Sequence, residues 1–99
     1  MTDQEFAALA ERTLARIEDA VDALEADIDA QRAGNVLTFE LESGEKVVVN
    51  TQQPMHEMWL AARSGGFHYR WDGAAWRDTR SGESLSEALS RVFGAPLQA

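Results

Sequence analysis

The chain has 99 residues, 44% of them hydrophobic, and carries a formal net charge of −8 at pH 7. This length suits one domain with a modest core, and no apolar run approaches the ~20 residues that span a bilayer. The absence of cysteine excludes disulfides and thiolate chemistry, and the acidic N-terminus lacks the pattern of a secretory signal. We therefore expect a single domain over residues 1–99, located in the cytoplasm, with no affinity for nucleic acid or membranes.

The negative charge lies in the first half of the chain. Residues 1–54 contain twelve acids and four bases, a net charge of −8, whereas residues 55–99 contain five of each. A field of this sign attracts cations and basic protein surfaces. Charge alone therefore indicates partners of these two classes.

Residues 3–25 are predicted to form an amphipathic helix. Thr2-Asp3-Gln4-Glu5 has the form of a capping box, which satisfies free N–H groups at the start of a helix. Apolar residues from Phe6 to Leu24 then recur at spacings of three and four, as on the buried face of a helix. The acids of a second face are Glu11, Glu18, Asp22 and Glu25, with Asp19 beside them.

These acids crowd toward the predicted end of the helix. From Ile17 to Gln31 there are six acids and no Lys or Arg. Each like-charged pair three or four residues apart costs a helix ~0.2–0.5 kcal/mol, and carboxylates are unfavourable at the negative end of the helix dipole. A local rule broken this consistently is expected at a functional site, although acidic faces also serve solubility alone. Clustered carboxylates suit hard cations or an Arg-rich partner surface, and the residues leave both open.

The next segments alternate as the strands of an antiparallel sheet do. Residues 27–31 predict a short edge strand, on which the charges of Asp27 and Asp29 guard against unwanted pairing. Residues 36–42 and 46–49 predict a hairpin with a tight connection. The first half of the sheet is thus expected to lie directly after the acidic helix.

Residues 57–61 predict a further strand, with Met58 and Leu60 toward the core and Trp59 on the opposite face with Glu57. An outward Trp is either a half-buried sheet residue or an anchor for a partner. The remaining β signals are a turn at Ser64-Gly65-Gly66 and strands over residues 67–71 and 74–78.

A second helix closes the chain. Ser84-Leu85-Ser86-Glu87 is another capping box, and Gly94 and Pro96 end the helix. The order helix, about six antiparallel strands, helix predicts an α+β fold. We expect a two-layer α–β sandwich whose N- and C-terminal helices pack on one face of the sheet and leave the other face open.

No usual catalytic motif is present. The chain lacks a phosphate-binding glycine loop, G-x-S-x-G and H-E-x-x-H, and nothing links its Ser and Asp residues into a triad. His56 and His68 lie on separate segments, where histidines are more often solvated than bound to metal. We therefore expect no catalytic residue and no enzymatic activity.

A nearly continuous set of family-specific motifs lies between residues 36 and 89. The most specific stretch runs from Trp59-Leu60-Ala61 through Ser64-Gly65-Gly66-Phe67-His68-Tyr69. The other matching residues are Asn50, Gln53-Pro54, Trp76, Asp78-Thr79-Arg80-Ser81-Gly82-Glu83, Leu85 and Leu89. Together these residues resemble the frataxin family in its bacterial, CyaY-type form.

The resemblance implies a regulator of iron–sulfur cluster assembly that contacts the cysteine desulfurase and the scaffold protein. It implies weak surface binding of iron, Fe²⁺ or Fe³⁺, and of other hard cations, by a monomer that iron can drive into oligomers. The predicted metal ligands, called the acidic ridge below, are Glu18, Asp19, Asp22, Glu25 and Asp29. Glu18, Asp19 and Asp22 would also contact the desulfurase, and Trp59 would engage a partner through the open sheet face.

Two alternatives from other classes stay open. The first alternative is a protein-interaction module whose binding of divalent or trivalent cations is incidental. The second is an iron oxidase. The oxidase would need a site that favours Fe³⁺ over Fe²⁺.

We predict low thermal stability that rises when cations or salt are added. Like charges in the acidic ridge repel one another, and screening or binding relieves that repulsion. The C-terminal tail after Pro96 is also shorter than in the family, where it helps to cover the gap between the helices. Thermal unfolding with and without added cations measures both effects, and a high melting temperature with no response to cations would contradict them.

Overall fold

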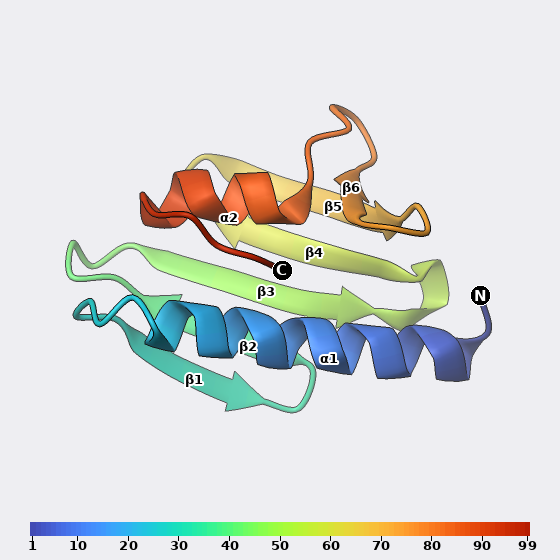
Figure 1. Ribbon diagram of the computed structural model, residues 1–99, viewed down its shortest axis with the longest axis horizontal. Coiled ribbons are helices and arrows are strands. Elements are labelled where there is room, and N and C mark those ends of the chain that lie inside the picture. The colour runs from blue at the N-terminus through green and yellow to red at the C-terminus, as the bar shows by residue number, and fades with distance from the viewer.

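A computed structural model describes all residues from 1 to 99. Two helices lie on one side of a six-stranded antiparallel sheet whose strands follow one another in chain order (Figure 1). This confirms the predicted two-layer α–β sandwich. The elements are α1 (Asp3–Asp22), β1 (Asp29–Ala33), β2 (Val36–Glu40), β3 (Lys46–Gln52), β4 (Glu57–Ala62), β5 (Gly65–Trp71), β6 (Trp76–Asp78) and α2 (Leu85–Phe93), with a 3₁₀ turn at Gln53–Met55. Neither helix has the length and apolar composition needed to cross a membrane.

The alternation of the strands puts nearly all buried side chains on the helix-covered face of the sheet. Met58 and Leu60 of β4 are buried there as predicted, while Trp59 between them is half-buried on the open face. One continuous core results. Its members are Phe6, Ala10, Leu14, Ile17 and Val21 of α1, Leu85, Ala88 and Leu89 of α2, Leu97, and the sheet residues Leu37, Phe39, Val47, Val49, Met58, Leu60, Tyr69 and Trp76.

Helix α1 starts where predicted and ends earlier than predicted. Thr2 and Glu5 form the complete capping box. The helix stops at Asp22, and Glu25 lies outside it in a left-handed backbone conformation with φ 55°. Val21 is the last fully buried side chain of the helix, and the acids that follow it oppose the helix dipole. The prediction of a helix to residue 25 was therefore wrong by about one turn.

The edge strand β1 begins at Asp29 and is largely exposed, which confirms the predicted edge position. Asp29 pairs with Glu40 and therefore shares the open face of the sheet. Arg32 pairs with Leu37, which is buried on the helix-covered face, so Arg32 faces α1. Asp29 and Arg32, the two charged residues of this strand, thus point to opposite sides of the sheet.

The hairpin between β4 and β5 is tighter than predicted. Gly65 and Gly66 pair with Ala62 and Ala61 as parts of β5, and the turn consists of Arg63 and Ser64 alone. This register places Trp59 opposite His68. The sequence predicted both glycines as turn residues, which was wrong. With a longer turn, β5 would start later and Trp59 would lie opposite a different residue.

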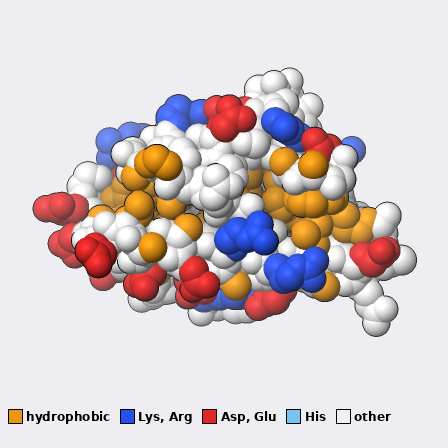
Figure 2. Space-filling view, viewed as in Figure 1, with side chains coloured by type: hydrophobic (Ala, Val, Ile, Leu, Met, Phe, Trp, Pro, Cys, Tyr) orange, Lys and Arg blue, Asp and Glu red, His pale blue; other side chains and the backbone are white.

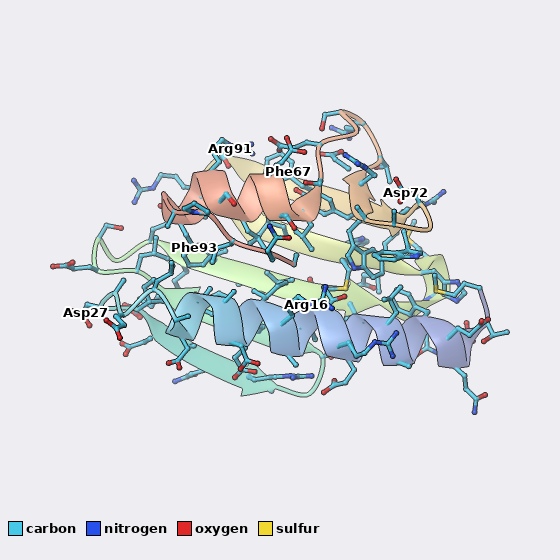
Figure 3. The ribbon with its side chains drawn as sticks, viewed as in Figure 1. Arg16, Asp27, Phe67, Asp72, Arg91 and Phe93 are labelled. Carbon is cyan, nitrogen blue, oxygen red and sulfur yellow. The ribbon has the colours of Figure 1, made fainter.

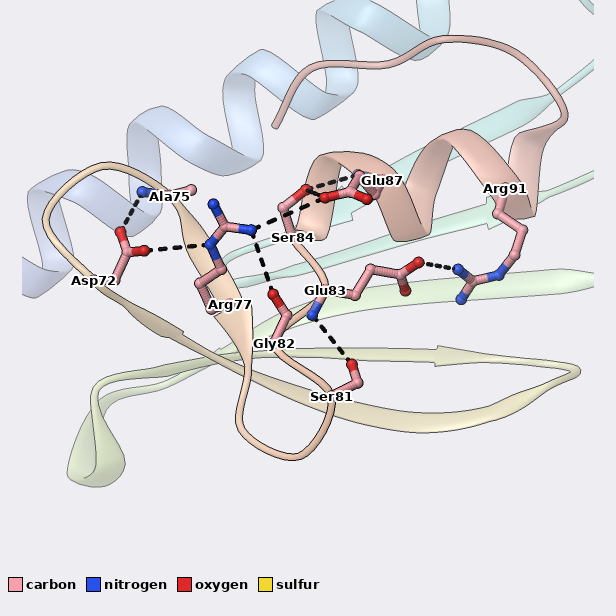
Figure 4. A network of polar contacts seen from close by, with 9 residues as sticks. All are labelled: Asp72, Ala75, Arg77, Ser81, Gly82, Glu83, Ser84, Glu87 and Arg91. Atoms are coloured by element: carbon pink, nitrogen blue, oxygen red, sulfur yellow. Dashed lines mark hydrogen bonds and ion pairs between the residues drawn. The ribbon is translucent and has the colours of Figure 1, made fainter.

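A polar network fixes the segment between β6 and α2 (Figure 4). The Arg77 guanidinium donates to Asp72 Oδ2 and to the carbonyl oxygen of Gly82, each at 3.3 Å. The Ser84 hydroxyl caps α2 by accepting from the backbone N–H of Glu87 at 3.1 Å. The network stabilises the β6 edge of the sheet, which is opposite the β1 edge.

The short C-terminal tail runs between the two helices (Figure 1). Leu97 is buried, and its backbone N–H donates to the Ser90 hydroxyl at 2.8 Å. The Ser86 hydroxyl accepts from Ala99 N–H at 2.9 Å, and Arg16, labelled in Figure 3, donates to the Ala99 carbonyl oxygen at 3.4 Å. The tail therefore covers part of the gap between α1 and α2 despite its length, and the predicted low stability stays a prediction.

Two buried polar groups in this core differ in their hydrogen bonding. Trp76 Nε1 donates to the Thr13 hydroxyl at 3.0 Å and so joins β6 to α1. The Tyr69 hydroxyl is buried without a hydrogen-bond partner, and this burial raises the pKa of Tyr69. An unsatisfied buried hydroxyl costs free energy that an apolar side chain of the same shape avoids.

We predict that Tyr69→Phe raises the free energy of unfolding by about 1 kcal/mol, because it removes the unsatisfied hydroxyl and keeps the ring. The contrasting variant is Thr13→Val, which leaves the Trp76 indole N–H unsatisfied and should lower the same free energy by about 1–3 kcal/mol. Urea unfolding of both variants measures the difference. A loss of stability in Tyr69→Phe would show that the hydroxyl has a favourable partner.

Candidate functional site: an acidic helix end and an open sheet face

The acids of α1 lie at the end of the helix that adjoins β1. Asp19 and Asp22 are exposed, and Glu18 is 39% exposed. Their position follows from the apolar stripe of α1, because burying Ile17 and Val21 against the sheet turns the adjacent positions outward. Figure 2 shows acidic side chains gathered at one end and along the lower edge of the molecule.

An open hollow of about 360 Å³ lies beside these acids. Glu18, Asp19 and Asp22 line one side of it. Its other lining residues are apolar and come from the end of α1, the segment that follows it and the start of β1: Val21, Ala26, Ile28 and Ala30. The lining of the hollow thus combines carboxylates with apolar side chains, which suits the aliphatic stem and charged head of a Lys or Arg side chain.

Arg32 of β1 supplies an internal counter-charge to part of this surface. Its guanidinium pairs with Glu11, and its Nη1 lies 3.8 Å from Glu18 Oε1. The Arg32 side chain is only 20% exposed and is further fixed by donating to the Gly34 carbonyl oxygen at 3.2 Å. Asp19 and Asp22 have no ion pair, so they carry the uncompensated charge of the helix end.

The acidic ridge is less compact than the sequence suggested. Glu25 and Asp29 are both exposed and neither lines the hollow. Glu25 lies in the turn after α1, and Asp29 lies on the open face of the sheet. Asp27, labelled in Figure 3, also lies in the exposed segment between α1 and β1.

Nowhere in the chain do three His, Cys, Asp or Glu side chains converge on one point where a metal ion would bind. The donors offered by the helix end are carboxylate oxygens only, which is the chemistry of hard cations. A cation there would be held by one or two carboxylates, with water completing its shell.

Four side chains form a second cluster on the open face of the sheet. The pairs Glu57–Arg70 and Trp59–His68 face each other across β4 and β5. The rings of Trp59 and His68 stack with centroids 4.2 Å apart and planes 7° from parallel. The Trp59 indole Nε1 donates to Glu57 Oε1 at 2.9 Å. Trp59 is therefore held along one edge and one ring face.

Glu57 is the buried member of this cluster, with a side chain only 2% exposed. Arg70 Nε donates to Glu57 Oε2 at 2.8 Å, and His68 Nδ1 lies 3.7 Å from Oε1. Burial favours the neutral acid, but the hydrogen bonds from the Trp59 indole and the Arg70 guanidinium outweigh it. The pKa of Glu57 consequently lies below its usual range, and the group is a carboxylate at neutral pH.

Sequence reasoning placed Trp59 and Glu57 on the open face but missed the partners that fix them. Those partners depend on the β4–β5 register, which the two-residue turn at Arg63-Ser64 would have provided. The role of Arg32 depends on packing between α1 and β1, and no short-range signal predicts it. His56, the other histidine, pairs with Asp3 at 2.7 Å and stacks on Phe6, so it secures the start of α1.

Comparison with known proteins places this geometry in a family. The family described as a frataxin-like domain matches residues 1–99. The "Iron-sulfur cluster assembly protein CyaY" of Cupriavidus pinatubonensis is 54% identical over 103 aligned residues, covering 100% of this chain and 93% of that protein.

Solved structures agree with this match. The frataxin of Psychromonas ingrahamii superimposes with a TM-score of 0.84 at 35% identity, covering 99% of this chain and 97% of that one. A trimeric yeast frataxin from Saccharomyces cerevisiae, described as complexed with ferrous iron, shares the fold with a TM-score of 0.78 at 24% identity, over 86% of this chain and 81% of that one. With the family match spanning its whole length and a curated relative identical at more than half of the aligned positions, the chain belongs to the frataxin-like family.

Proposed function

We propose that the protein is a cytoplasmic, iron-associating regulator of iron–sulfur cluster assembly, acting by contact with the assembly machinery and not as an enzyme. The observation that carries this proposal is the full-length similarity to an iron–sulfur cluster assembly protein. The two surfaces described above supply the physical means, because one is acidic and the other presents a fixed aromatic ring.

Iron is proposed to associate with the exposed carboxylates at the end of α1. Asp19 and Asp22 are the strongest candidates, since neither is engaged in an ion pair. Glu18 shares its charge with Arg32 and contributes less, and Glu25 and Asp29 add negative potential from outside the hollow. The complex of yeast frataxin with ferrous iron supports iron as the cation.

The cysteine desulfurase is proposed to approach the same acidic end with a basic patch. A Lys or Arg side chain could lay its stem on Ala26 and Ile28 and reach the carboxylates of Asp19 and Asp22. A basic side chain would use both the apolar and the acidic lining of the hollow, whereas iron needs only the carboxylates. The two ligands would therefore compete for the same charges.

The scaffold protein is proposed to contact Trp59 on the open sheet face. The acids of α1 lie in the helix layer, and Trp59 lies on the side of β4 away from the helices. Because these surfaces face different ways, two partners can be bound at the same time. This arrangement suits a regulator that acts on an assembled complex.

A second candidate is a protein-interaction module whose cation binding is incidental. It is favoured by the absence of three converging ligands and by the presence of Arg32 among the acids. The two candidates differ in whether loss of iron binding changes the effect on cluster assembly.

We predict that the double variant Asp19→Asn/Asp22→Asn weakens both iron binding and desulfurase binding. Loss of two exposed charge pairs, each contributing about 0.2–1 kcal/mol, corresponds to a roughly two- to thirtyfold weaker desulfurase complex. Replacement of the same residues by Lys should abolish both interactions through repulsion. Iron titration and desulfurase titration of the same preparations measure the effects side by side.

The control is Glu83→Gln/Glu87→Gln, which removes the same number of charges near the β6 end of the sheet, where they pair with Arg91 and Arg77. It should leave the affinities for iron and for the desulfurase within about twofold of the parent chain, because salt screens the electrostatic effect of a surface charge beyond about 10 Å. Desulfurase binding that survives Asp19→Asn/Asp22→Asn while iron binding is lost would favour the interaction module. No change in either measurement would remove the helix end from the proposed function.

We also predict that Trp59→Ala weakens binding to the scaffold protein by about tenfold or more, as truncation of a central aromatic anchor does. Desulfurase binding through the acidic end should be unchanged, since it uses the other side of the molecule. Titration with each partner separately tests this. Normal scaffold binding by Trp59→Ala would return Trp59 to a purely structural role.

A further inference from the structure

Glu57 lies on the face of the sheet that no helix covers, yet its side chain is 2% exposed. Burying a carboxylate is costly unless hydrogen bonds compensate both of its oxygens. A carboxylate whose only role is to keep the protein soluble would stay exposed to water. The burial of Glu57 therefore indicates a role in the structure of the open face.

Both oxygens of Glu57 are engaged by side chains of its own cluster. Oε1 accepts from the Trp59 indole at 2.9 Å, and Oε2 accepts from Arg70 Nε at 2.8 Å. Arg70 is 63% exposed, so it closes the cluster toward solvent and holds the carboxylate in place. A carboxylate fixed in this way is a rigid acceptor for the indole N–H.

The stacking partner restricts the Trp59 ring from another direction. His68 lies directly across the β4–β5 ladder and stacks on the indole with centroids 4.2 Å apart. Stacking alone would still allow the indole to slide across the imidazole or to flip over so that its other face meets His68. The hydrogen bond to Glu57 removes that freedom, because only one orientation points Nε1 at Oε1.

We infer that Glu57 is a positioning residue that holds the Trp59 indole in a single orientation on the open sheet face, ready for a partner. The inference rests on the proposed contact between Trp59 and the scaffold protein. A ring already fixed before binding loses little conformational freedom on association. Glu57 thereby strengthens an interface without having to touch the partner.

The test compares Glu57→Leu, which removes the acceptor, with Glu57→Gln, which keeps an oxygen at the same position. Without any partner, solvent exchange of the Trp59 indole N–H is followed by NMR and assigned with Trp59→Phe. We expect fast exchange in Glu57→Leu and protection restored in Glu57→Gln. The Trp76 indole N–H, bound to Thr13 in the core, is an internal control and should not change.

Scaffold binding by the same variants completes the test. We expect Glu57→Leu to bind about threefold to tenfold more weakly and Glu57→Gln to bind within about twofold of the parent chain. Retained protection of Trp59 in Glu57→Leu, or equal loss of protection at Trp59 and Trp76, would overturn the inference. If Trp59→Ala binds the scaffold normally, the proposed contact and the affinity part of the inference both fail, while the exchange measurement still decides the positioning of Trp59.

Discussion

The fold depends on burial of the apolar stripe of α1 against one face of the sheet. Each buried side chain such as Leu14 or Ile17 contributes about 1.5–3 kcal/mol, whereas a like-charged pair on the outer face costs only about 0.2–0.5 kcal/mol. Burial therefore outweighs repulsion as far as Val21, and the helix survives with an acidic face. Beyond Val21 no fully buried side chain remains in this segment, and the helix ends at Asp22. The same packing that forms the helix displays its acids.

The charge of the helix end is shaped by the strand beside it. Alternation in β1 turns Arg32 toward α1, where it pairs with Glu11 and Glu18, and turns Asp29 toward the open face. The edge strand thus neutralises the earlier part of the acidic stripe and leaves the last turn of α1 uncompensated. The six acids between Ile17 and Gln31 are thus reduced to a short, localised patch of uncompensated charge centred on Asp19 and Asp22.

Local patterns were sufficient for the elements and for the acids of α1, because helix and strand periodicities depend on neighbouring residues only. The end of α1 was missed since apolar spacing continues to Leu24, while the backbone turns to a left-handed conformation at Glu25. The Glu57 cluster was missed for a different reason. Its contacts join two strands, and reading Gly65 and Gly66 as a turn shifts every partner across that hairpin. Arg32 required knowledge of which face of β1 meets α1, which no short stretch contains.

Under the proposed function the two surfaces contribute to binding by different physics. Exposed carboxylates at the end of α1 act at a distance, so they accelerate and orient the approach of a basic partner and lose strength as salt rises. The Trp59 ring acts only on contact, and desolvated aromatic anchors mainly lengthen the lifetime of a complex. The structure matches each task, because Asp19 and Asp22 are exposed at a helix end while Trp59 is fixed by a buried carboxylate and a stacked ring. The fixed ring on the open face and the exposed charge in the helix layer can thus be tuned separately, one through packing and the other through net charge.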